Sequence, residues 1–368
     1  MDLEKRIELI ARAPTEEVVT RDELRALLEK EEHPIAYNGW EPSGLVHLGT
    51  GLMCAYKMKD LIDAGVKFKA YLATWHGWIN GKLGGDMEAI RKAALHFKHA
   101  WIACGVPEDK IEFVWPEEIY DDIDYWNLVM KVAKELTVAR TVRTLEIAGR
   151  GEEGDETRKV AELLYTPMQV ADIFRLKVRI CQLGTDQRKA NMVAREVGEK
   201  LGFWKPVCVH HHLLQGLAKP PQWPLPADAT ERKRLLSSVK MSKSRPETCI
   251  YIYDSPEDIK KKLGNAFCPE REVEFNPVVD IARQIVFREK AGKGMTIERP
   301  AKFGGRLELQ TFEELSKVYA EGKLHPMDLK NAVAGELVDI LEPVRDYFQK
   351  NKEAQDTLKF LREQKATR

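Results

Sequence analysis

Two short segments of the chain carry side chains suited to phosphate chemistry. They are Pro42-Ser43-Gly44-Leu45-Val46-His47-Leu48-Gly49 and, much later, Lys240-Met241-Ser242-Lys243-Ser244. Glycines in the first segment let the backbone approach a nucleotide closely, and a neutral His47 donates to a phosphoryl oxygen without adding bulk. In the second segment, Lys240 and Lys243 are long point charges that can neutralise charge growing on a departing pyrophosphate. Together the segments predict binding and activation of ATP.

Each segment alone has an interpretation without chemistry. Either segment alone could occur by chance, and the run 231–245, with six basic residues against one acidic, could be a solvated loop. When the first segment is followed by the second in one chain, the two form the signature of the class I aminoacyl-tRNA synthetases. The chain resembles this family. The resemblance implies that ATP is a substrate, that an adenylate forms, and that Mg²⁺ accompanies the pyrophosphate.

Strands and helices alternate around the first segment. We expect strands at 35–40, 67–74 and 111–115, with helices at about 51–64 and 85–104 between them. This βαβαβ order predicts an α/β fold with a Rossmann-like, doubly wound parallel sheet, whose ligand lies at the carboxyl ends of the strands. A helix at 168–176, a strand at 178–183 and a helix at 187–201 complete the second half.

The rest of the chain is expected to be mainly helical. Residues 1–33 form an N-terminal helical segment with two short helices joined around Pro14 and a capping box from Thr20 to Glu23. Residues 34–246 form the catalytic domain, with a helical insertion at about 120–164 and a polar connector at 149–156. Residues 247–368 form a C-terminal helical domain.

Composition sets limits on function. Lys plus Arg equals Asp plus Glu, at 58 each, so a nucleic-acid partner would have to rest on local basic patches. The six cysteines include no Cys-x-x-Cys pair, which argues against a zinc knuckle or a disulfide framework, and no metal-ligand set is expected. The N-terminus mixes charges and no apolar run is long enough to span a bilayer, so we expect a soluble, cytoplasmic protein without a membrane partner.

Several further stretches narrow the resemblance. They are Glu41-Pro42-Ser43-Gly44, Tyr165-Thr166-Pro167-Met168-Gln169-Val170-Ala171-Asp172, Gly184-Thr185-Asp186-Gln187-Arg188-Lys189, Ala266-Phe267-Cys268-Pro269, 299–305 and 324–333. With these stretches the chain resembles the tyrosyl-tRNA synthetases of the archaeal and eukaryotic type along nearly its whole length. The resemblance is weakest at the two ends. It implies that the C-terminal domain binds the anticodon.

An amino-acid pocket is expected between the first strand and the helix at 168–176. On that helix Gln169 and Asp172 share a face, with Tyr165 one turn earlier, and a carboxylate with Tyr37 could hydrogen-bond one phenol hydroxyl. The resemblance implies that Tyr37 and Asp172 bind the phenol oxygen of tyrosine, while Tyr165, Gln169 and Gln187 bind its α-amino group. Without the family resemblance, Gln169 and Asp172 would be interpreted as the solvent-exposed face of a helix, and Tyr37 would be interpreted as an aromatic residue of the core.

Phenylalanine should be rejected by such a pocket, because it would leave the partners of the hydroxyl unpaired. A discrimination of about 10⁵ is the established figure for a tyrosyl enzyme. No editing domain is therefore expected.

Contacts with tRNA(Tyr) are implied at two places. Arg188 and Lys189 match positions near the first acceptor base pair, and Phe303, His325 and Asp328 match positions that read the anticodon. A solvated helix start is the alternative at both sites. The insertion is where related enzymes form a two-fold dimer, so a homodimer is expected.

Some positions depart from the family pattern, and three rival functions remain. Thr74 replaces a frequent aspartate, Thr50 replaces the second histidine of the first segment, and Tyr71 with Thr74 leaves the shape of the pocket open. The rivals are a tryptophanyl enzyme, a catalytically idle RNA-binding paralogue and a metabolite nucleotidyltransferase. The pairing of Asp172 with Tyr37 argues against the first, the intact catalytic set against the second, and the long helical C-terminal region against the third.

Overall fold

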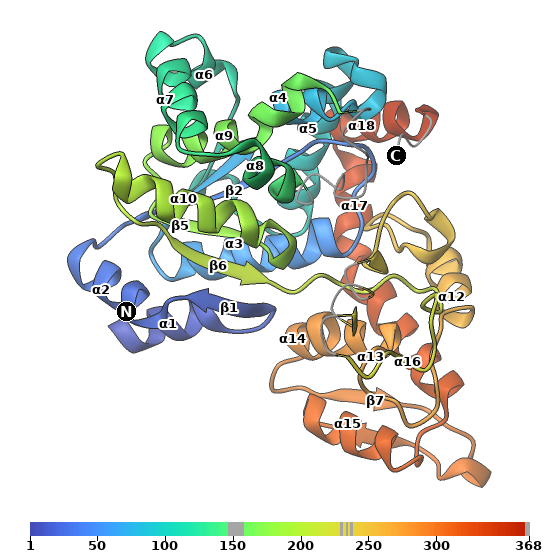
Figure 1. The fold of residues 1–368 in the computed structure, drawn as a ribbon. Helices are drawn as coiled ribbons and strands as arrows, with labels where there is room; N and C mark the ends of the chain where they lie inside the picture. The colour runs from blue at the N-terminus through green and yellow to red at the C-terminus, as the bar shows by residue number, and fades with distance from the viewer. Residues whose placement is uncertain (146–157, 229–230, 233–234, 236–237, 365–368) are drawn as a thin grey trace. The chain divides into compact units, whose positions relative to one another are not determined.

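The structure is a computed structural model that describes residues 1–145, 158–228, 231–232, 235 and 238–364. Its chain divides into two compact units (Figure 1). The first unit comprises Met1–Gly44, Ala55–His212 and Lys359–Arg368, and the second comprises Leu45–Cys54 and Leu213–Leu358. Contacts therefore group His47 and the lysine segment 240–244 with the helical C-terminal region. The expected connector at 149–156 lies outside the described residues.

A six-stranded sheet with the order β1-β6-β5-β2-β3-β4 forms the centre of the first unit. Its strands are β1 (Thr15–Val19), β2 (Ile35–Trp40), β3 (Lys67–Leu72), β4 (Ile111–Val114), β5 (Ile180–Gly184) and β6 (Val207–His211). All neighbouring pairs are parallel except β1 with β6. The predicted doubly wound sheet is confirmed, and the strand order reverses between β2 and β5, where such folds bind ligands.

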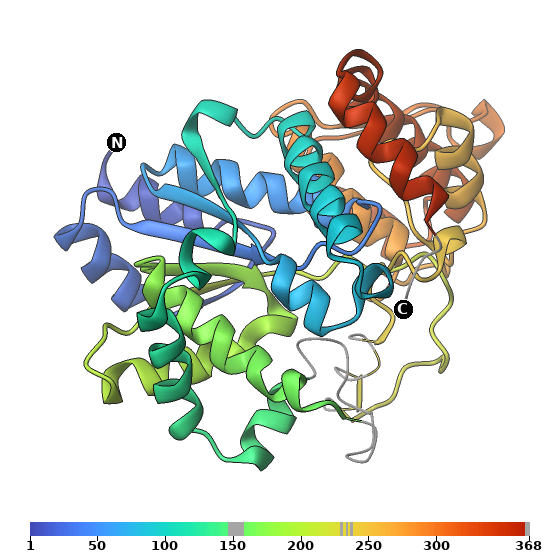
Figure 2. The same cartoon turned by 90° about the horizontal axis from the view of Figure 1, so that it is seen from above.

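Helices cover both faces of this sheet. They are α1 (Leu3–Ala11), α2 (Arg21–Lys30), α3 (Cys54–Asp63), α4 (Thr74–Ile79), α5 (Met87–Ala103), α6 (Glu117–Tyr120), α7 (Ile123–Lys134), α8 (Val138–Thr144), α9 (Val160–Arg175) and α10 (Arg188–Lys200). Figure 2 shows α3 and α5 on one face and α9 and α10 on the other, as right-handed crossovers in opposite directions require. None of the helices in the described ranges is both long and apolar enough to cross a bilayer.

The N-terminal segment differs from the expectation of two helices alone. The helices and the capping box at Thr20 and Glu23 are present, but β1 lies between them and pairs antiparallel with β6. Neither strand was expected. The sequence of β1 contains two carboxylates, Glu16 and Glu17, which obscure its strand character. Glu17 accepts from His210 Nδ1 of β6 at 2.8 Å, so the pairing is stabilised by contacts that are distant in sequence.

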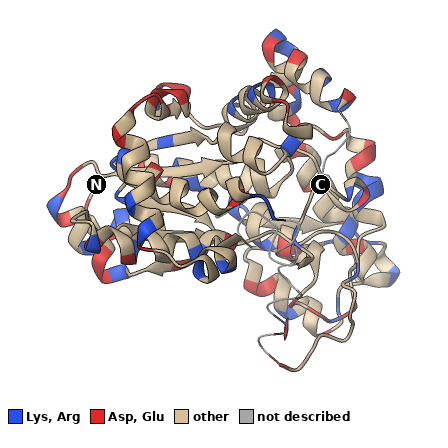
Figure 3. Ribbon diagram, turned by 45° about the horizontal axis from the view of Figure 1, so that its top comes forward, with Lys and Arg blue, Asp and Glu red and all other residues tan. Residues whose placement is uncertain are grey.

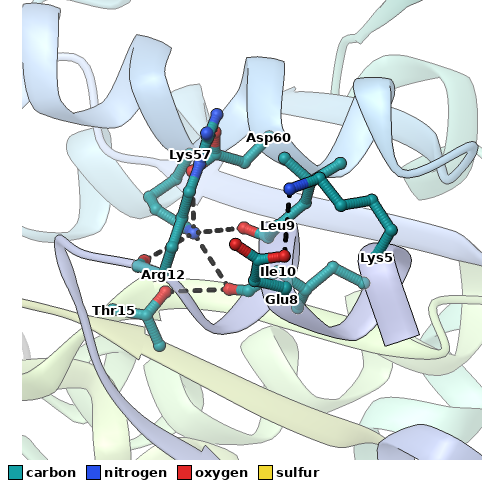
Figure 4. Close-up of polar contacts among 8 residues, drawn as sticks. All are labelled: Lys5, Glu8, Leu9, Ile10, Arg12, Thr15, Lys57 and Asp60. Carbon is teal, nitrogen blue, oxygen red and sulfur yellow. Dashed lines mark hydrogen bonds and ion pairs between the residues drawn. The ribbon is translucent and has the colours of Figure 1, made fainter. Parts of the chain in front are cut away.

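A buried ammonium group joins the end of α1 to α3 (Figure 4). Lys57 Nζ donates to the carbonyl oxygen of Ile10 at 2.9 Å and to Asp60 Oδ2 at 3.0 Å. It also approaches the carbonyls of Leu9 and Arg12, and Arg12 Nε donates to Asp60 Oδ1 at 2.9 Å. A buried charge is stable only when it has such partners. The burial of the Lys57 ammonium group therefore requires the observed conformation of the backbone at residues 9–12.

The second unit is mainly helical after the lysine segment. Its elements are α12 (Pro256–Gly264), α13 (Pro277–Ile281), α14 (Phe287–Glu289), the antiparallel strands β7 (Met295–Ile297) and β8 (Leu307–Leu309), then α15 (Phe312–Ala320), α16 (Pro326–Ile340), α17 (Glu342–Lys350) and the part of α18 (Lys352–Glu363) that precedes Lys359. The apolar pattern predicts one helix over 325–349, but the structure interrupts it at Leu341, because Pro343 in the first turn of α17 has no N–H to continue α16. The three-residue strands were not expected.

Candidate active site

The residues expected to bind an amino acid lie in the first unit. Tyr165, Gln169 and Asp172 are all on α9, and each is buried. The fourth residue, Tyr37, is on β2 and is 1% exposed. The helix begins earlier than the expected residue 168, at Val160, so one regular helix sets the spacing of all three side chains.

Asp172 is surrounded by tyrosine hydroxyls. Its Oδ1 accepts from Tyr125 Oη at 2.9 Å, from Tyr120 Oη at 3.3 Å and from Tyr71 Oη at 3.4 Å. Tyr71 Oη also lies 2.9 Å from Tyr120 Oη, so its single proton is shared between Tyr120 Oη and Asp172 Oδ1. Burial raises the pKa of Asp172 to about 8, although the three hydroxyls, Tyr125 first, act to lower it. The carboxyl group therefore holds its proton readily in the free protein.

Local backbone geometry brings these rings together. Gly39 of β2 is in register with Tyr71 of β3, and a Cβ at Gly39 would lie 3.0 Å from the ring of Tyr37. Glycine therefore leaves room for an aromatic ring there. Tyr120 ends α6 and Tyr125 lies in α7, so the turn between the helices lets both side chains point inward, with their rings stacked at 4.4 Å.

Unpartnered polar atoms in the same core mark a place for a ligand. Among the described residues, Tyr37 Oη and Gln169 Oε1 are buried and have no hydrogen-bond partner. Gln169 Nε2 donates to Gln187 Oε1 at 3.4 Å, so the structure brings these two predicted residues together. Buried polar groups without partners cost free energy unless a ligand supplies a bond.

Glu41 belongs to the stretch Glu41-Pro42-Ser43-Gly44 and contacts the predicted site residue Tyr165, although no role was predicted for it. Its Oε2 accepts from Tyr165 Oη at 2.8 Å and from Asn80 Nδ2 at 3.1 Å, and its Oε1 lies 3.3 Å from Lys82 Nζ. Tyr120 and Tyr125 were also missed. They lie five residues apart, which on one continuous helix would place them on different faces, so no periodicity indicated them.

His47 and the lysine segment 240–244 both belong to the second unit, and the charges of Lys240 and Lys243 act on the His47 ring. The backbone around His47 pairs with the segment at Tyr251, and Leu48 N donates to the carbonyl of Ile250 at 3.0 Å. A Cβ at Gly51 would lie 2.8 Å from side-chain atoms of both Val46 and Ile252. A tight turn that excludes side chains therefore follows His47.

His47 is held in one neutral tautomer. Gly49 N donates to its Nδ1 at 3.2 Å, which places the ring proton on Nε2. Burial, together with the smaller effects of the positive charges of Lys243 and Lys240, lowers the pKa of His47 to about 3. The ring is thus an uncharged donor in the field of the two lysines.

The lysine segment is hydrogen-bonded to the rest of the unit at Lys240 and Met241, and it becomes solvent-exposed at Ser244. Met241 is buried and its N–H donates to the carbonyl of Leu214 at 2.7 Å, while Lys240 forms a bridge with Gln215. Ser242 Oγ and Ser244 Oγ lie 3.0 Å apart. Residues 233–234 and 236–237 of the basic run lie outside the described residues.

The two residues expected near the acceptor stem start α10. Arg188 and Lys189 are both exposed. Arg188 Nε donates to both carboxylate oxygens of Glu17, at 3.0 and 2.9 Å, and Glu17 also accepts from His210. The unexpected strand β1 therefore holds the guanidinium group of Arg188 through its Nε.

The three residues expected at the anticodon lie on neighbouring surface segments of the second unit. Phe303 is 60% exposed in the turn Ala301–Phe303, and His325 caps α16 by accepting from Met327 N at 3.2 Å. Asp328 lies in the first turn of α16. Arg299 joins the two segments, because it donates to the carbonyls of Gly305 at 3.0 Å and Lys323 at 2.9 Å.

Charges are interspersed on the surface. Figure 3 shows positions of Lys and Arg mixed with positions of Asp and Glu over the ribbon. Within the described ranges no group of three or more His, Cys, Asp or Glu side chains could hold a metal ion.

Known proteins are similar to this chain in sequence and in fold. Residues 29–342 match the family of class I tRNA synthetases (W and Y). The tyrosine–tRNA ligase of Thermococcus kodakarensis is 50% identical over 382 residues, with both chains covered completely, and that of Thermococcus sibiricus is 49% identical over 98% of each chain. A crystal structure of tyrosyl-tRNA synthetase complexed with L-tyrosine from Pyrococcus horikoshii matches with a TM-score of 0.92 and 46% identity, covering 98% of this chain and 100% of that one.

Proposed function

The chain belongs to the class I tRNA synthetases of the tryptophan and tyrosine type, and on this premise we propose that it is a tyrosine–tRNA ligase. It activates tyrosine with ATP to tyrosyl-adenylate and pyrophosphate, then transfers the tyrosyl group to the 3′ end of tRNA(Tyr). The observation that carries the proposal is the buried carboxyl group of Asp172 in the same core as the unpartnered hydroxyl of Tyr37.

Tyrosine recognition follows from these groups. Asp172 accepts a hydrogen bond from the phenol of the substrate, and Tyr37 donates one to it. Tyr165, Gln169 and Gln187 bind the α-amino group. Phenylalanine makes neither phenol bond and leaves both partners unsatisfied in a buried site, so no editing step is needed.

The activation step relies on position and charge. The Nε2–H of His47 donates to a phosphoryl oxygen, and Lys240 and Lys243 stabilise the charge that develops on the leaving pyrophosphate. The backbone of Gly44, Gly49 and the segment from Met241 to Ser244 binds the rest of ATP. Mg²⁺ bound to the phosphates supplies further charge neutralisation.

The domain roles, assembly and location complete the proposal. Residues 34–246 carry the activation and transfer steps, and 247–368 bind the anticodon. The chain is a cytoplasmic homodimer, and its interface lies on the insertion, where large apolar side chains are exposed at Ile123, Met130 and Val138.

Sedimentation equilibrium should give twice the mass of one chain. A monomer at micromolar concentration would contradict the dimer.

The decisive experiment is ATP–pyrophosphate exchange measured with each of the twenty amino acids. Exchange that depends on tyrosine supports the proposal, whereas exchange that depends on tryptophan would indicate the related enzyme. Absence of exchange with every amino acid would indicate an idle RNA-binding paralogue. Subsequent charging of tRNA(Tyr) separates a ligase from a nucleotidyltransferase that uses small molecules.

We expect His325→Ala and Asp328→Ala to lower tRNA charging without changing pyrophosphate exchange, because both residues lie in the anticodon region. The loss should be mainly a higher KM for tRNA. It should be smaller for a tRNA altered at the first anticodon base, since a contact already deleted cannot be lost again. Equal losses for normal and altered tRNA would contradict the anticodon assignment.

Arg188→Ala should weaken discrimination at the first acceptor base pair. The family prefers C1–G72 there, and Arg188 is the exposed cation that β1 holds in place. The measurement compares charging of tRNA with C1–G72 and with G1–C72. Glu17→Gln is the matched variant, because it loosens Arg188 without removing it and should show a smaller change in the same direction. An unchanged preference in both variants would refute the contact.

A further inference from the structure

The two oxygens of the Asp172 carboxyl group have different surroundings. All hydrogen bonds that the described residues make to this group end on Oδ1, and they come from three tyrosines on three different elements. Oδ2 lies 3.7 Å from His76 Nε2, beyond hydrogen-bonding distance. Burial lowers the pKa of His76 to about 4, so its ring is neutral and does not form an ion pair with Asp172. One oxygen is thus fixed and the other faces a group that does not bind it.

We propose that Tyr71, Tyr120 and Tyr125 are positioning residues for tyrosine recognition: they hold Asp172 through Oδ1 and leave Oδ2 to accept the hydrogen bond of the substrate's phenol. This inference rests on the proposed function. The three tyrosines do not react and need not touch the substrate. They act through Asp172, by fixing the rotation of its carboxyl group and by supplying donors to it.

The donors also set the pH range in which recognition works. The groups that face Asp172 from each neighbouring element are Tyr37 of β2, Tyr71 of β3, His76 of α4, Tyr120 of α6 and Tyr125 of α7. Each hydroxyl that donates to Oδ1 stabilises the ionised form, which burial disfavours. The phenol of the substrate adds one more donor. Tyrosine binding should therefore favour the carboxylate and release a proton below about pH 8, so the affinity for tyrosine should rise with pH up to that value.

The first test uses the unmodified protein. Calorimetric titration with tyrosine at pH 7, in two buffers of different ionisation enthalpy, should show release of roughly one proton per site. Phenylalanine, which brings no hydroxyl, should release none at concentrations high enough to bind. Equal proton release for the two amino acids would overturn the linkage to Asp172.

The second test removes single hydroxyls with Tyr125→Phe and Tyr71→Phe. Each should raise the KM for tyrosine in pyrophosphate exchange by roughly tenfold, with kcat changed much less, because the lost donor bonded a charged group. The pH at which kcat/KM levels off should move upward. Tyr56→Phe is the matched control, since Tyr56 is a buried tyrosine of α3 whose hydroxyl makes no bond to Asp172 within the described structure, and it should leave these values unchanged.

Phenylalanine-dependent pyrophosphate exchange shows whether a variant has lost activity in general or only the recognition of tyrosine. A positioning role predicts that kcat/KM for phenylalanine stays constant while that for tyrosine falls. Parallel losses for both amino acids, or an unchanged KM and pH profile in both variants, would overturn the inference. Failure of the proposed function is a separate result, because the unmodified protein would then show no tyrosine-dependent exchange.

Discussion

Lys240→Ala and Lys243→Ala are expected to slow tyrosyl-adenylate formation by roughly one to three orders of magnitude, with little change in tyrosine affinity. Both charges lie close enough to lower the pKa of His47, so they belong to one electrostatic group with that ring. They face charge that develops only as pyrophosphate leaves, and groups of this kind affect the transition state more than the ground state. Pyrophosphate exchange and single-turnover kinetics measure the rate, and calorimetry measures tyrosine binding.

A control separates this effect from a general loss of positive charge. Lys260→Ala removes an exposed lysine from α12 of the same unit and should leave the rate within about twofold, as is usual for surface positions. If the loop variants lost tyrosine affinity as much as rate, the lysines would have a ground-state role instead.

Asp172→Asn is expected to reduce the preference for tyrosine over phenylalanine, measured as the ratio of kcat/KM values, by roughly two orders of magnitude. Asparagine keeps the shape of the side chain. Its amide, however, cannot accept on both sides, so it no longer bonds the three tyrosine hydroxyls and the substrate phenol at once. Most of the change should be lost activity with tyrosine, because phenylalanine never made the bond.

The matched variant is Asp109→Asn, which removes an exposed carboxylate between α5 and β4 and should leave the ratio unchanged. A ratio that stays constant in Asp172→Asn would show that the phenol is recognised elsewhere. Thermal unfolding should accompany both measurements, since the substitution also changes a buried group.

The sequence predicted the family and the doubly wound fold because local signals were strong there. β2 and β3 are short segments rich in apolar and aromatic residues and are followed by helices, and the glycines before α3 mark a turn. These features lie within about 30 residues of each other, the size of one βαβ unit. The shared face of Gln169 and Asp172 could likewise be predicted from helix periodicity, whereas the predicted helix began at 168 and so did not include Tyr165.

Other parts could not be predicted, because their cause is distant in the chain. Tyr71, Tyr120 and Tyr125 converge on Asp172 from separate elements, so no spacing relates them. Tyr71 was noted only as a departure that left the pocket open. The pairing of β1 with β6 depends on contacts such as Glu17 with His210, which are 193 residues apart. The roles given to individual residues stay predictions until the variants are measured.

That pairing also affects how the protein is made. β1 leaves the ribosome well before β6, its only strand partner in the described structure, which follows nearly 200 residues later. Closing so long a loop is entropically costly, and contacts of this range form late. During synthesis the first strand therefore stays unpaired while β2, β3 and β4 are already available to associate. The edge of the sheet, with the Arg188 side chain that it fixes, is completed only after the chain has passed residue 211.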